Sequence, residues 1–288
     1  MSIATNSTQD LPIITIPPSP PNFHTHTIIF LHGRGDNTRS FTRALQNWYS
    51  SRGTTLFETF PTIRWVFPQA PLRPIASTAG PARQPYAFPQ WFDVWTSRNF
   101  SAREEVQIEG LRESVPAIRD IIAREAARLG GRWDRVILAG ISMGAATSAH
   151  TLFNLDVPPE GGGRLAAFLG FCGRCPFAGR SLQGMREVLT LPGAPAGGEN
   201  GVLSRTPILL EHNVDDPLVL VENGRRLRDT LRGFGAQVEW KEYATGGHWF
   251  QEPEGIDDVV EFLNRVVLGG NASERTKAAA DPEAMDLS

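Results

Sequence analysis

The chain has 288 residues, of which 41% are hydrophobic and 20% charged, and its formal net charge is -3. These values are typical of a globular protein with a substantial core, and they exclude the basic surface of a nucleic-acid-binding protein. Two cysteines are too few for a disulfide framework and suit a reducing compartment. We find no signal peptide and no membrane-spanning apolar run, so we expect a cytoplasmic protein without nucleic-acid or integral membrane contacts.

The two ends of the chain differ in composition from the part between them. Residues 1–22 are polar and then proline-rich, which predicts a flexible N-terminal lead. Residues 269–288 have no apolar face, which predicts a disordered C-terminal tail. We therefore expect one folded domain over residues 23–268.

Strands and helices are predicted to alternate through this domain. The predicted strands cover residues 27–31, 64–67, 135–139, 166–171, 208–211 and 238–243. The first five are short apolar runs, as expected of strands covered on both faces. The predicted helices cover residues 41–52, 111–129, 144–153, 221–234 and 256–267. This alternation predicts the α/β class, with a mostly parallel, doubly wound sheet in a single domain.

Three features interrupt the regular pattern. Pro116 lies inside the predicted helix 111–129, where it predicts a kink or a second helix start capped by Ser114. Two long connections rich in proline and glycine span residues 68–103 and 172–206. Connections of this length are usually functional loops or disordered segments.

A serine stands between two glycines where the predicted strand 135–139 meets the next helix, in Gly140-Ile-Ser142-Met-Gly144. A nucleophilic serine needs an exposed hydroxyl, a base and donors for the oxyanion. A sharp strand-to-helix turn would expose Ser142 and aim the Met143 amide at the oxyanion, and the glycines would leave room for it. The alternative is a tight structural turn, because the short pattern also arises by chance.

The base and the acid should follow the serine in the order acid, then histidine. His248 lies in a glycine-flanked loop after the last predicted strand, and the alternative role is a surface ion pair. Asp215 and Asp216 follow the strand 208–211. We favour Asp216 as the acid because the proline after it holds it extended, which leaves Asp215 as a solvated or capping carboxylate. His212 is expected to brace the acid loop by hydrogen bonds.

The second oxyanion donor is expected in the loop after the first predicted strand. In this loop Gly33 and Gly35 allow close approach of the backbone, and the Arg34 amide is the candidate donor. The loop lacks the third glycine of a dinucleotide-binding motif, so we reject that function. His32 is expected to anchor the loop.

Six segments together resemble one known family. The segments FLHGRGDN, VFPQAPLRP, QWFDVW, GISMGAA, HNVDDPLV and GGHWF occur in the order found in the acyl-protein thioesterase/phospholipase–carboxylesterase family of α/β-hydrolases. The resemblance spans roughly residues 27–267. It implies a single-domain α/β-hydrolase without a large lid, which acts on thioesters of lipidated proteins, on lysophospholipids or on small esters.

The resemblance also implies roles for individual residues. It makes Ser142 the nucleophile, and Asp216 and His248 its partners. The backbone amides of Arg34 and Met143 would form the oxyanion hole. The predicted reaction is ester or thioester hydrolysis of the acyl-protein thioesterase type, and it requires no metal or organic cofactor.

The chain departs from the family pattern at several places. Met143 stands where glutamine is usual, Arg34 where leucine is common, and GFCGRCPF where the segment is more apolar. The connection over residues 172–206 is also longer. Two alternatives stay open beside the thioesterase: a small-molecule carboxylesterase that tailors a secondary metabolite, and a catalytically silent binding protein with this fold.

Aromatic residues are crowded in the connection 68–103 and suggest an acyl-binding wall made by Trp91, Phe92 and Trp95. The alternative is a loop that Trp91 and Phe92 pin to the core. With the wall in place we expect a narrow apolar channel for a linear acyl chain, and a polar or anionic leaving group at its mouth. Cys172 and Cys175 have metal-site spacing but lack a second pair of ligands, so we expect them to pack at a strand end.

Overall fold

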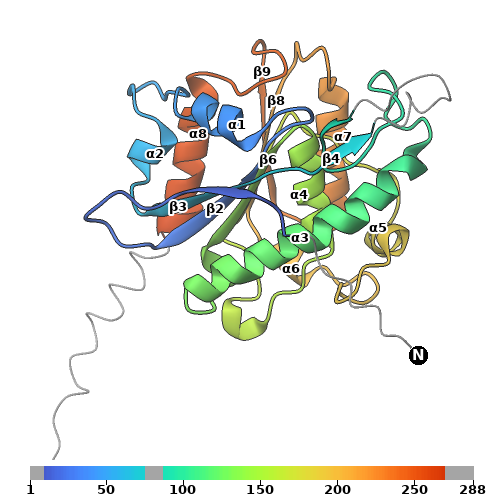
Figure 1. Cartoon of the computed structure of the whole chain (residues 1–288), viewed down its shortest axis with the longest axis horizontal. Helices are drawn as coiled ribbons and strands as arrows, with labels where there is room; N and C mark the ends of the chain where they lie inside the picture. Colours follow the sequence, from blue (N-terminus) through green and yellow to red (C-terminus); the bar gives the residue numbers. More distant parts are fainter. Residues whose placement is uncertain (1–9, 75–86, 270–288) are drawn as a thin grey trace, which may run out of the picture.

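The computed structural model describes residues 10–74 and 87–269. Its centre is a seven-stranded sheet in the order β1-β3-β2-β6-β7-β8-β9 (Figure 1). The strands are β1 (Ile13–Ile16), β2 (His26–Leu31), β3 (Ile63–Pro68), β6 (Val136–Ile141), β7 (Ala167–Phe171), β8 (Ile208–Asn213) and β9 (Val238–Tyr243). All neighbouring strands are parallel except β1 and β3. Two short strands, β4 (Leu72–Pro74) and β5 (Ala87–Pro89), form a separate antiparallel pair.

Helices cover both faces of the sheet (Figure 1). The helices are α1 (Thr38–Leu45), α2 (Leu56–Thr59), α3 (Gln107–Arg128), α4 (Met143–Phe153), α5 (Leu182–Leu189), α6 (Gly201–Arg205), α7 (Val221–Gly233) and α8 (Glu254–Leu263). One hydrophobic core lies between the sheet and the helices α1, α2 and α8. A second core lies between the other face of the sheet and the helices α3, α4, α5, α6 and α7. This is the predicted doubly wound, mostly parallel α/β fold.

Short turns of helix complete the described elements. Three 3₁₀ turns cover Glu104–Val106, Trp133–Arg135 and Pro159–Gly161, and a π-helical turn over Asn264–Leu268 continues α8. Among the described helices, none combines the length and the apolar character that crossing a bilayer requires.

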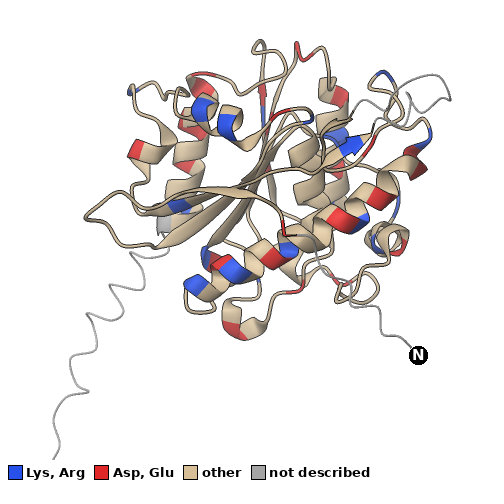
Figure 2. Ribbon diagram, in the orientation of Figure 1, with Lys and Arg blue, Asp and Glu red and all other residues tan. Residues whose placement is uncertain are grey.

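The central strands show why their sequences are almost continuously apolar. Alternate side chains of β6 enter different cores: Val136 and Leu138 face the α3–α7 side, whereas Ile137 and Ala139 face the α1–α2–α8 side. A strand that is covered on both faces has no solvated face for polar residues. Figure 2 accordingly shows acidic and basic residues on the outer helices, with both signs along α3, while β2, β6 and β7 carry none.

The N-terminal lead differs from the prediction. Residues 13–16 lie within the segment expected to be flexible, yet they form β1, which pairs antiparallel with β3. Ile14 and Ile16 pack against the core while Ile13 and Thr15 point outward, so β1 is a half-buried edge strand. Residues 1–9 and 270–288 lie outside the described residues, and so does nearly all of the expected tail.

The connection over residues 172–206 was predicted to be a loop, but it contains the two helices α5 and α6. Ser181 caps α5, because its hydroxyl accepts a hydrogen bond from the Gly184 amide at 3.1 Å. Leu182, Met185 and Leu189 bury one face of this helix. A serine cap followed by apolar residues at helical spacing is a signal that predicts a helix. The surrounding proline and glycine residues concealed it.

The predicted helices also shift in detail. α3 runs through Pro116 as one helix, and the Ser114 hydroxyl donates to the Trp91 carbonyl at 2.6 Å instead of capping a second start. α1 begins earlier than predicted because Asn37 caps it, accepting from the Ser40 amide. It ends at Leu45, well before the predicted residue 52.

Candidate active site

Ser142 occupies a strained turn between β6 and α4. Its backbone has φ 57° and ψ -119°, a conformation that costs a non-glycine residue on the order of 1–3 kcal/mol. Its amide donates to the Phe171 carbonyl of β7 at 2.8 Å, and its carbonyl accepts from the Ala146 amide at 3.1 Å. The sheet and the helix therefore hold this conformation from both sides, which is the geometry of a nucleophile elbow.

The glycines on either side of Ser142 are required by space. A Cβ atom on Gly140 would overlap the backbone of Gly144 and Ala145. A Cβ atom on Gly144 would overlap the carbonyl groups of Leu31 and His32 at the end of β2. These close approaches bring α4 down onto the carboxyl ends of β6 and β2.

The loop after β2 passes beside the elbow, as expected. A Cβ built on Gly33 lies 3.5 Å from the Ser142 Cβ, so the following Arg34 amide belongs to the same corner of the site. Gly35 has φ 81° and donates to the Pro89 carbonyl at 2.7 Å. On the other side, Met143 is the first residue of α4, and amides in the first turn have no intrahelical partner.

His32 anchors this loop from below. Its Nδ1 donates to the Gly33 carbonyl at 2.8 Å and its Nε2 accepts from the Ala70 amide at 3.1 Å. Burial lowers the pKa of His32, which favours the neutral ring that these two bonds require. The structure thus places His32 in the predicted anchoring position.

Asp216 and His248 meet at the carboxyl edge of the sheet. Asp216 Oδ2 lies 2.7 Å from His248 Nδ1, and Oδ1 accepts from the Leu218 and Val219 amides at 2.9 Å each. Burial opposes ionisation of Asp216, but hydrogen bonds from His212, His248 and the Val219 amide outweigh it and lower its pKa. The carboxylate is therefore ionised and held rigidly against His248.

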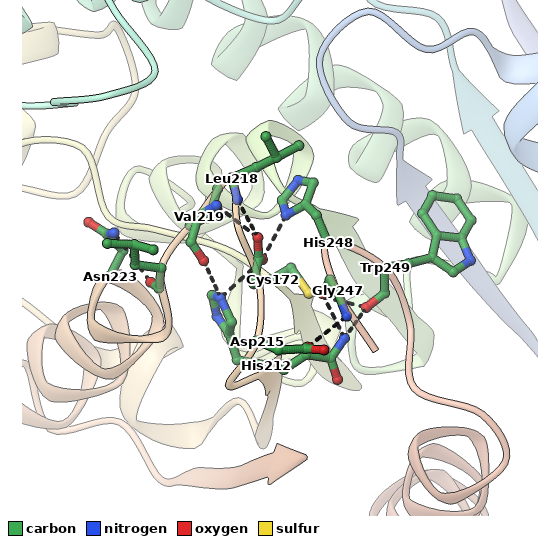
Figure 3. A network of polar contacts seen from close by, with 12 residues as sticks. Cys172, His212, Asp215, Leu218, Val219, Asn223, Gly247, His248 and Trp249 are labelled. Atoms are coloured by element: carbon green, nitrogen blue, oxygen red, sulfur yellow. Dashed lines mark hydrogen bonds and ion pairs between the residues drawn. The ribbon is translucent and has the colours of Figure 1, made fainter. Parts of the chain in front are cut away.

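His212 contacts the same carboxylate, and Figure 3 shows its ring directed toward the Val219 carbonyl. Its Nε2 lies 2.7 Å from the Val219 carbonyl and 3.3 Å from Asp216 Oδ2. Both atoms are acceptors, so Nε2 carries the proton. Among the described residues His212 Nδ1 has no hydrogen-bond partner, and it lies against Gly224. This is the bracing geometry that the sequence predicted.

The loop that carries His248 is held by two residues, Asp215 and Asn213, for which this role was not predicted. Asp215 Oδ1 accepts from the Gly247 amide at 2.8 Å, and Oδ2 accepts from the Gly246 amide at 3.3 Å. Asn213 Nδ2 donates to the carbonyls of Gly247 at 2.9 Å and Trp249 at 2.7 Å. Both residues follow the apolar part of β8, and this polar run was the available signal.

The two cysteines are buried free thiols. The sulfur of Cys172 lies 3.2 Å from the Trp249 carbonyl, and potential ligand atoms of Cys172, His212 and Asp216 lie within 4.8 Å of one another. Burial raises the pKa of both thiols, that of Cys175 to about 12. A metal would need a thiolate and a free nitrogen, whereas burial favours the neutral thiol, His212 Nε2 is a donor and Nδ1 lies against Gly224. The predicted packing role fits this environment.

Ser142 and His248 line one cavity of about 350 Å³. Apolar parts of its wall come from Val94, Phe100, Ile141, Met143, Leu218, Val219 and Trp249. The expected wall residues lie elsewhere. Trp91 and Phe92 are fully buried in the core, where the Trp91 indole donates to the His32 carbonyl at 2.9 Å. The Arg103 guanidinium covers the ring of Trp95 at 4.4 Å.

Comparison with known proteins decides the family. The sequence profile of the Phospholipase/Carboxylesterase family matches residues 15–267, which is most of the chain. The chain belongs to this family. Among curated relatives, it is 28% identical over 246 residues to acyl-protein thioesterase 1 of Gibberella zeae, covering 84% of this chain and 91% of the relative. It is 26% identical over 243 residues to the protein of that name in Debaryomyces hansenii, covering 83% and 90%.

Solved structures with the same fold include two plant proteins. Acyl-protein thioesterase 2 of Zea mays is 27% identical with a TM-score of 0.64, and the match covers 88% of this chain and 98% of that one. Arabidopsis thaliana SOBER1, at 23% identity and a TM-score of 0.63, matches over 84% and 99%. The predicted α/β-hydrolase fold is confirmed, and this family member is a serine hydrolase of the ester and thioester type.

Proposed function

We propose that Ser142, His248 and Asp216 are the catalytic triad of this hydrolase. The observation that carries the proposal is the 2.7 Å contact between His248 Nδ1 and the buried Asp216 carboxylate, together with the cavity that both Ser142 and His248 line. Because Nδ1–H donates to Asp216, the basic nitrogen of His248 is Nε2. That nitrogen serves as the base for the serine hydroxyl, and Asp216 stabilises the imidazolium that forms.

The reaction then proceeds through an acyl-enzyme. His248 takes the proton of Ser142, the serine oxygen attacks the acyl carbon, and the amides of Arg34 and Met143 hold the oxyanion. His248 gives the proton to the departing alcohol or thiol as the acyl–oxygen or acyl–sulfur bond breaks. It next deprotonates a water that attacks the acyl-enzyme, which releases the carboxylic acid and restores Ser142.

The substrate class rests on two different observations. The names of the relatives support a thioester of an acylated protein, and the family description, Phospholipase/Carboxylesterase, also admits phospholipids and carboxylic esters. A cavity of about 350 Å³ lies at the small end of ligand sites, and two arginines, Arg34 and Arg174, line it. These features favour the second candidate, a carboxylesterase for a small polar ester.

Labelling with a fluorophosphonate probe tests the triad. We expect covalent labelling of the wild-type protein at Ser142, no labelling of Ser142→Ala and strongly reduced labelling of His248→Ala. Ser148→Ala is the matched control, because Ser148 lies buried on α4 with its hydroxyl on the Ala139 carbonyl. The control should label like the wild type.

Hydrolysis of 4-nitrophenyl butyrate and of a butyryl thioester provides the second readout. Ser142→Ala and His248→Ala should each abolish most turnover, and the double variant should be little worse, because the residues act as one unit. A well-folded protein that neither labels nor hydrolyses either substrate would support the catalytically silent binding protein instead.

A further inference from the structure

A buried arginine lies in the cavity beside the proposed nucleophile. Arg174 follows β7 in a turn that packs on the helix of the elbow, since a Cβ built on Gly173 lies 2.8 Å from the Ala145 Cβ. Arg174 is 6% exposed and lines the cavity together with Ser142 and His248. The turn therefore places a positive charge in a site whose remaining wall is largely apolar.

The described surroundings of Arg174 provide no ion-pair partner in direct contact. Its Nη2 donates to the Gln107 side chain at 2.8 Å, and its guanidinium lies over the rings of Phe100 at 4.3 Å and Phe92 at 5.4 Å. Within the described parts of the chain, no carboxylate lies within 4.0 Å of it. Glu104 attracts it from farther away and accepts the Phe177 amide at 2.6 Å.

A buried charge without an ion-pair partner is costly, so its presence in a cavity indicates an anionic occupant. Burial lowers the pKa of Arg174 to about 10, and the group remains charged at neutral pH. Its planar fork of donors matches an oxyanion such as a carboxylate. The two phenyl rings contact the guanidinium without competing for its donors.

Arg34 adds a second guanidinium to the same cavity. Its Nε donates to Gln90 at 2.8 Å, and its Nη2 lies 3.8 Å from an Asp93 oxygen. That Nη2 is buried and makes no hydrogen bond to the described residues. Asp36, the carboxylate in the cavity lining, accepts the Asn37 amide at 2.7 Å. Asp93 is thus set against Arg34, whereas Arg174 has no described carboxylate within 4.0 Å, so Arg174 is the group that an anionic ligand would pair with first.

We propose that Arg174 and Arg34 bind a carboxylate group of the substrate, so that this hydrolase prefers esters or thioesters that carry a carboxylate. The inference rests on the proposed function of Ser142. It narrows the substrate class to compounds such as half-esters of dicarboxylic acids, in which the free carboxylate occupies the cavity and the ester lies at the serine.

Matched substrate pairs test the proposal and locate the carboxylate. Monobenzyl glutarate carries it on the acyl group, and benzyl 5-oxohexanoate is its neutral counterpart. The butyrate ester of 4-(hydroxymethyl)benzoic acid carries it on the leaving group, with the ester of 4-(hydroxymethyl)benzamide as counterpart. We expect kcat/KM to favour the carboxylate in at least one pair by about tenfold or more. This preference should persist in high salt, because the site is buried.

Variants of Arg174 connect that preference to the residue. Arg174→Met should lower the charged-to-neutral ratio about tenfold or more, and Arg174→Lys should retain part of it. Arg225→Met on α7 removes the same charge from a surface ion pair with Glu242 of β9 and should leave the ratio unchanged. If Arg174→Met does not fold, the wild-type ratios and Arg174→Lys decide the question.

Binding without turnover separates this inference from the proposed function. Calorimetry on Ser142→Ala should show monobenzyl glutarate or the benzoate ester binding more tightly than its neutral counterpart. If the wild-type protein binds the charged ester more tightly than the neutral one but hydrolyses no ester, only the proposed triad is overturned. Neutral esters hydrolysed at equal or higher kcat/KM than both charged esters would overturn only the carboxylate site. Preference for lysophosphatidylcholine over both charged esters would also overturn it, in favour of a phosphodiester.

Discussion

Asp215 and Asp216 are neighbours in sequence, yet they hold different parts of the site. Asp216 Oδ2 meets the donors of His212 and His248, while Oδ1 meets two backbone amides. Asp215 lies at the surface and ties down the glycines before His248. The buried aspartate therefore orients the imidazole, and the exposed one positions the loop that carries it.

Substitution of each aspartate by asparagine should separate these roles. Both oxygens of Asp216 accept hydrogen bonds, so in Asp216→Asn the amide nitrogen must face a donor and the imidazole loses its orienting partner. By analogy with the serine proteases, kcat should fall on the order of 10⁴-fold. Asp215→Asn keeps an oxygen for the Gly247 amide and should cost little. Steady-state kinetics with 4-nitrophenyl butyrate measures both changes. A larger loss from Asp215→Asn would mean that the acid is assigned to the wrong neighbour.

At the scale of elements, the elbow depends on the distance between backbones. β6 ends where α4 begins, and the two glycines allow α4 to approach both β6 and β2 without side chains between them. The Met143 amide and the loop after β2 are brought together by this packing. The proposed oxyanion hole therefore depends on how a helix and two strands pack.

Alanine at Gly140 should consequently damage both stability and activity. The added Cβ meets backbone atoms that have no freedom to rotate away, so we expect a loss of about 1–3 kcal/mol in the free energy of unfolding and a lower kcat. Denaturant unfolding and ester hydrolysis measure the two effects. Gly233→Ala at the end of α7 is the control, because nothing lies within 4 Å of its Cβ position. Equal behaviour of the two variants would contradict the packing argument.

The stability of the whole molecule should depend on pH through buried histidines. Burial lowers the pKa of His26 and His150 to about 4. His150 donates from Nε2 to the Pro176 carbonyl at 3.1 Å, and its Nδ1 has no hydrogen-bond partner among the described residues. The unfolded chain takes up these protons near pH 6.5, whereas the folded protein does so only near pH 4. The contribution of these two histidines to stability is therefore fully present above pH 6.5, and it is lost as the pH falls from about 6.5 to about 4.

Replacing His150 by glutamine should remove part of this pH dependence. Glutamine retains a donor for the Pro176 carbonyl but does not titrate. Between pH 7 and pH 4 the wild type should lose about 3 kcal/mol through His150, and His150→Gln should lose correspondingly less. Urea unfolding at the two pH values measures the difference. His24→Gln, at a partly exposed histidine, should change the slope less, and an unchanged slope in His150→Gln would contradict the assignment.

Local patterns were sufficient for much of this molecule. Continuous apolar runs indicated the parallel strands, since burial on both faces leaves no other composition. The elbow motif and the chain order of Ser142, an aspartate and His248 indicated the site. Trp91 and Phe92 were ambiguous, because an aromatic residue in a loop has the same local pattern whether it lines a cavity or fills the core.

The sequence alone determined the parallel strands of the sheet, the helices α1, α3, α4, α7 and α8 in outline, and the candidate triad, because each depends on periodicity or on a short motif. The tertiary structure alone decided which residues surround that site. Asn213 and Asp215 hold the histidine loop from more than thirty residues away, and Arg174 reaches the cavity from a turn beside β7. No local pattern predicts these contacts, since they arise only when parallel strands bring their carboxyl ends to one edge of the sheet.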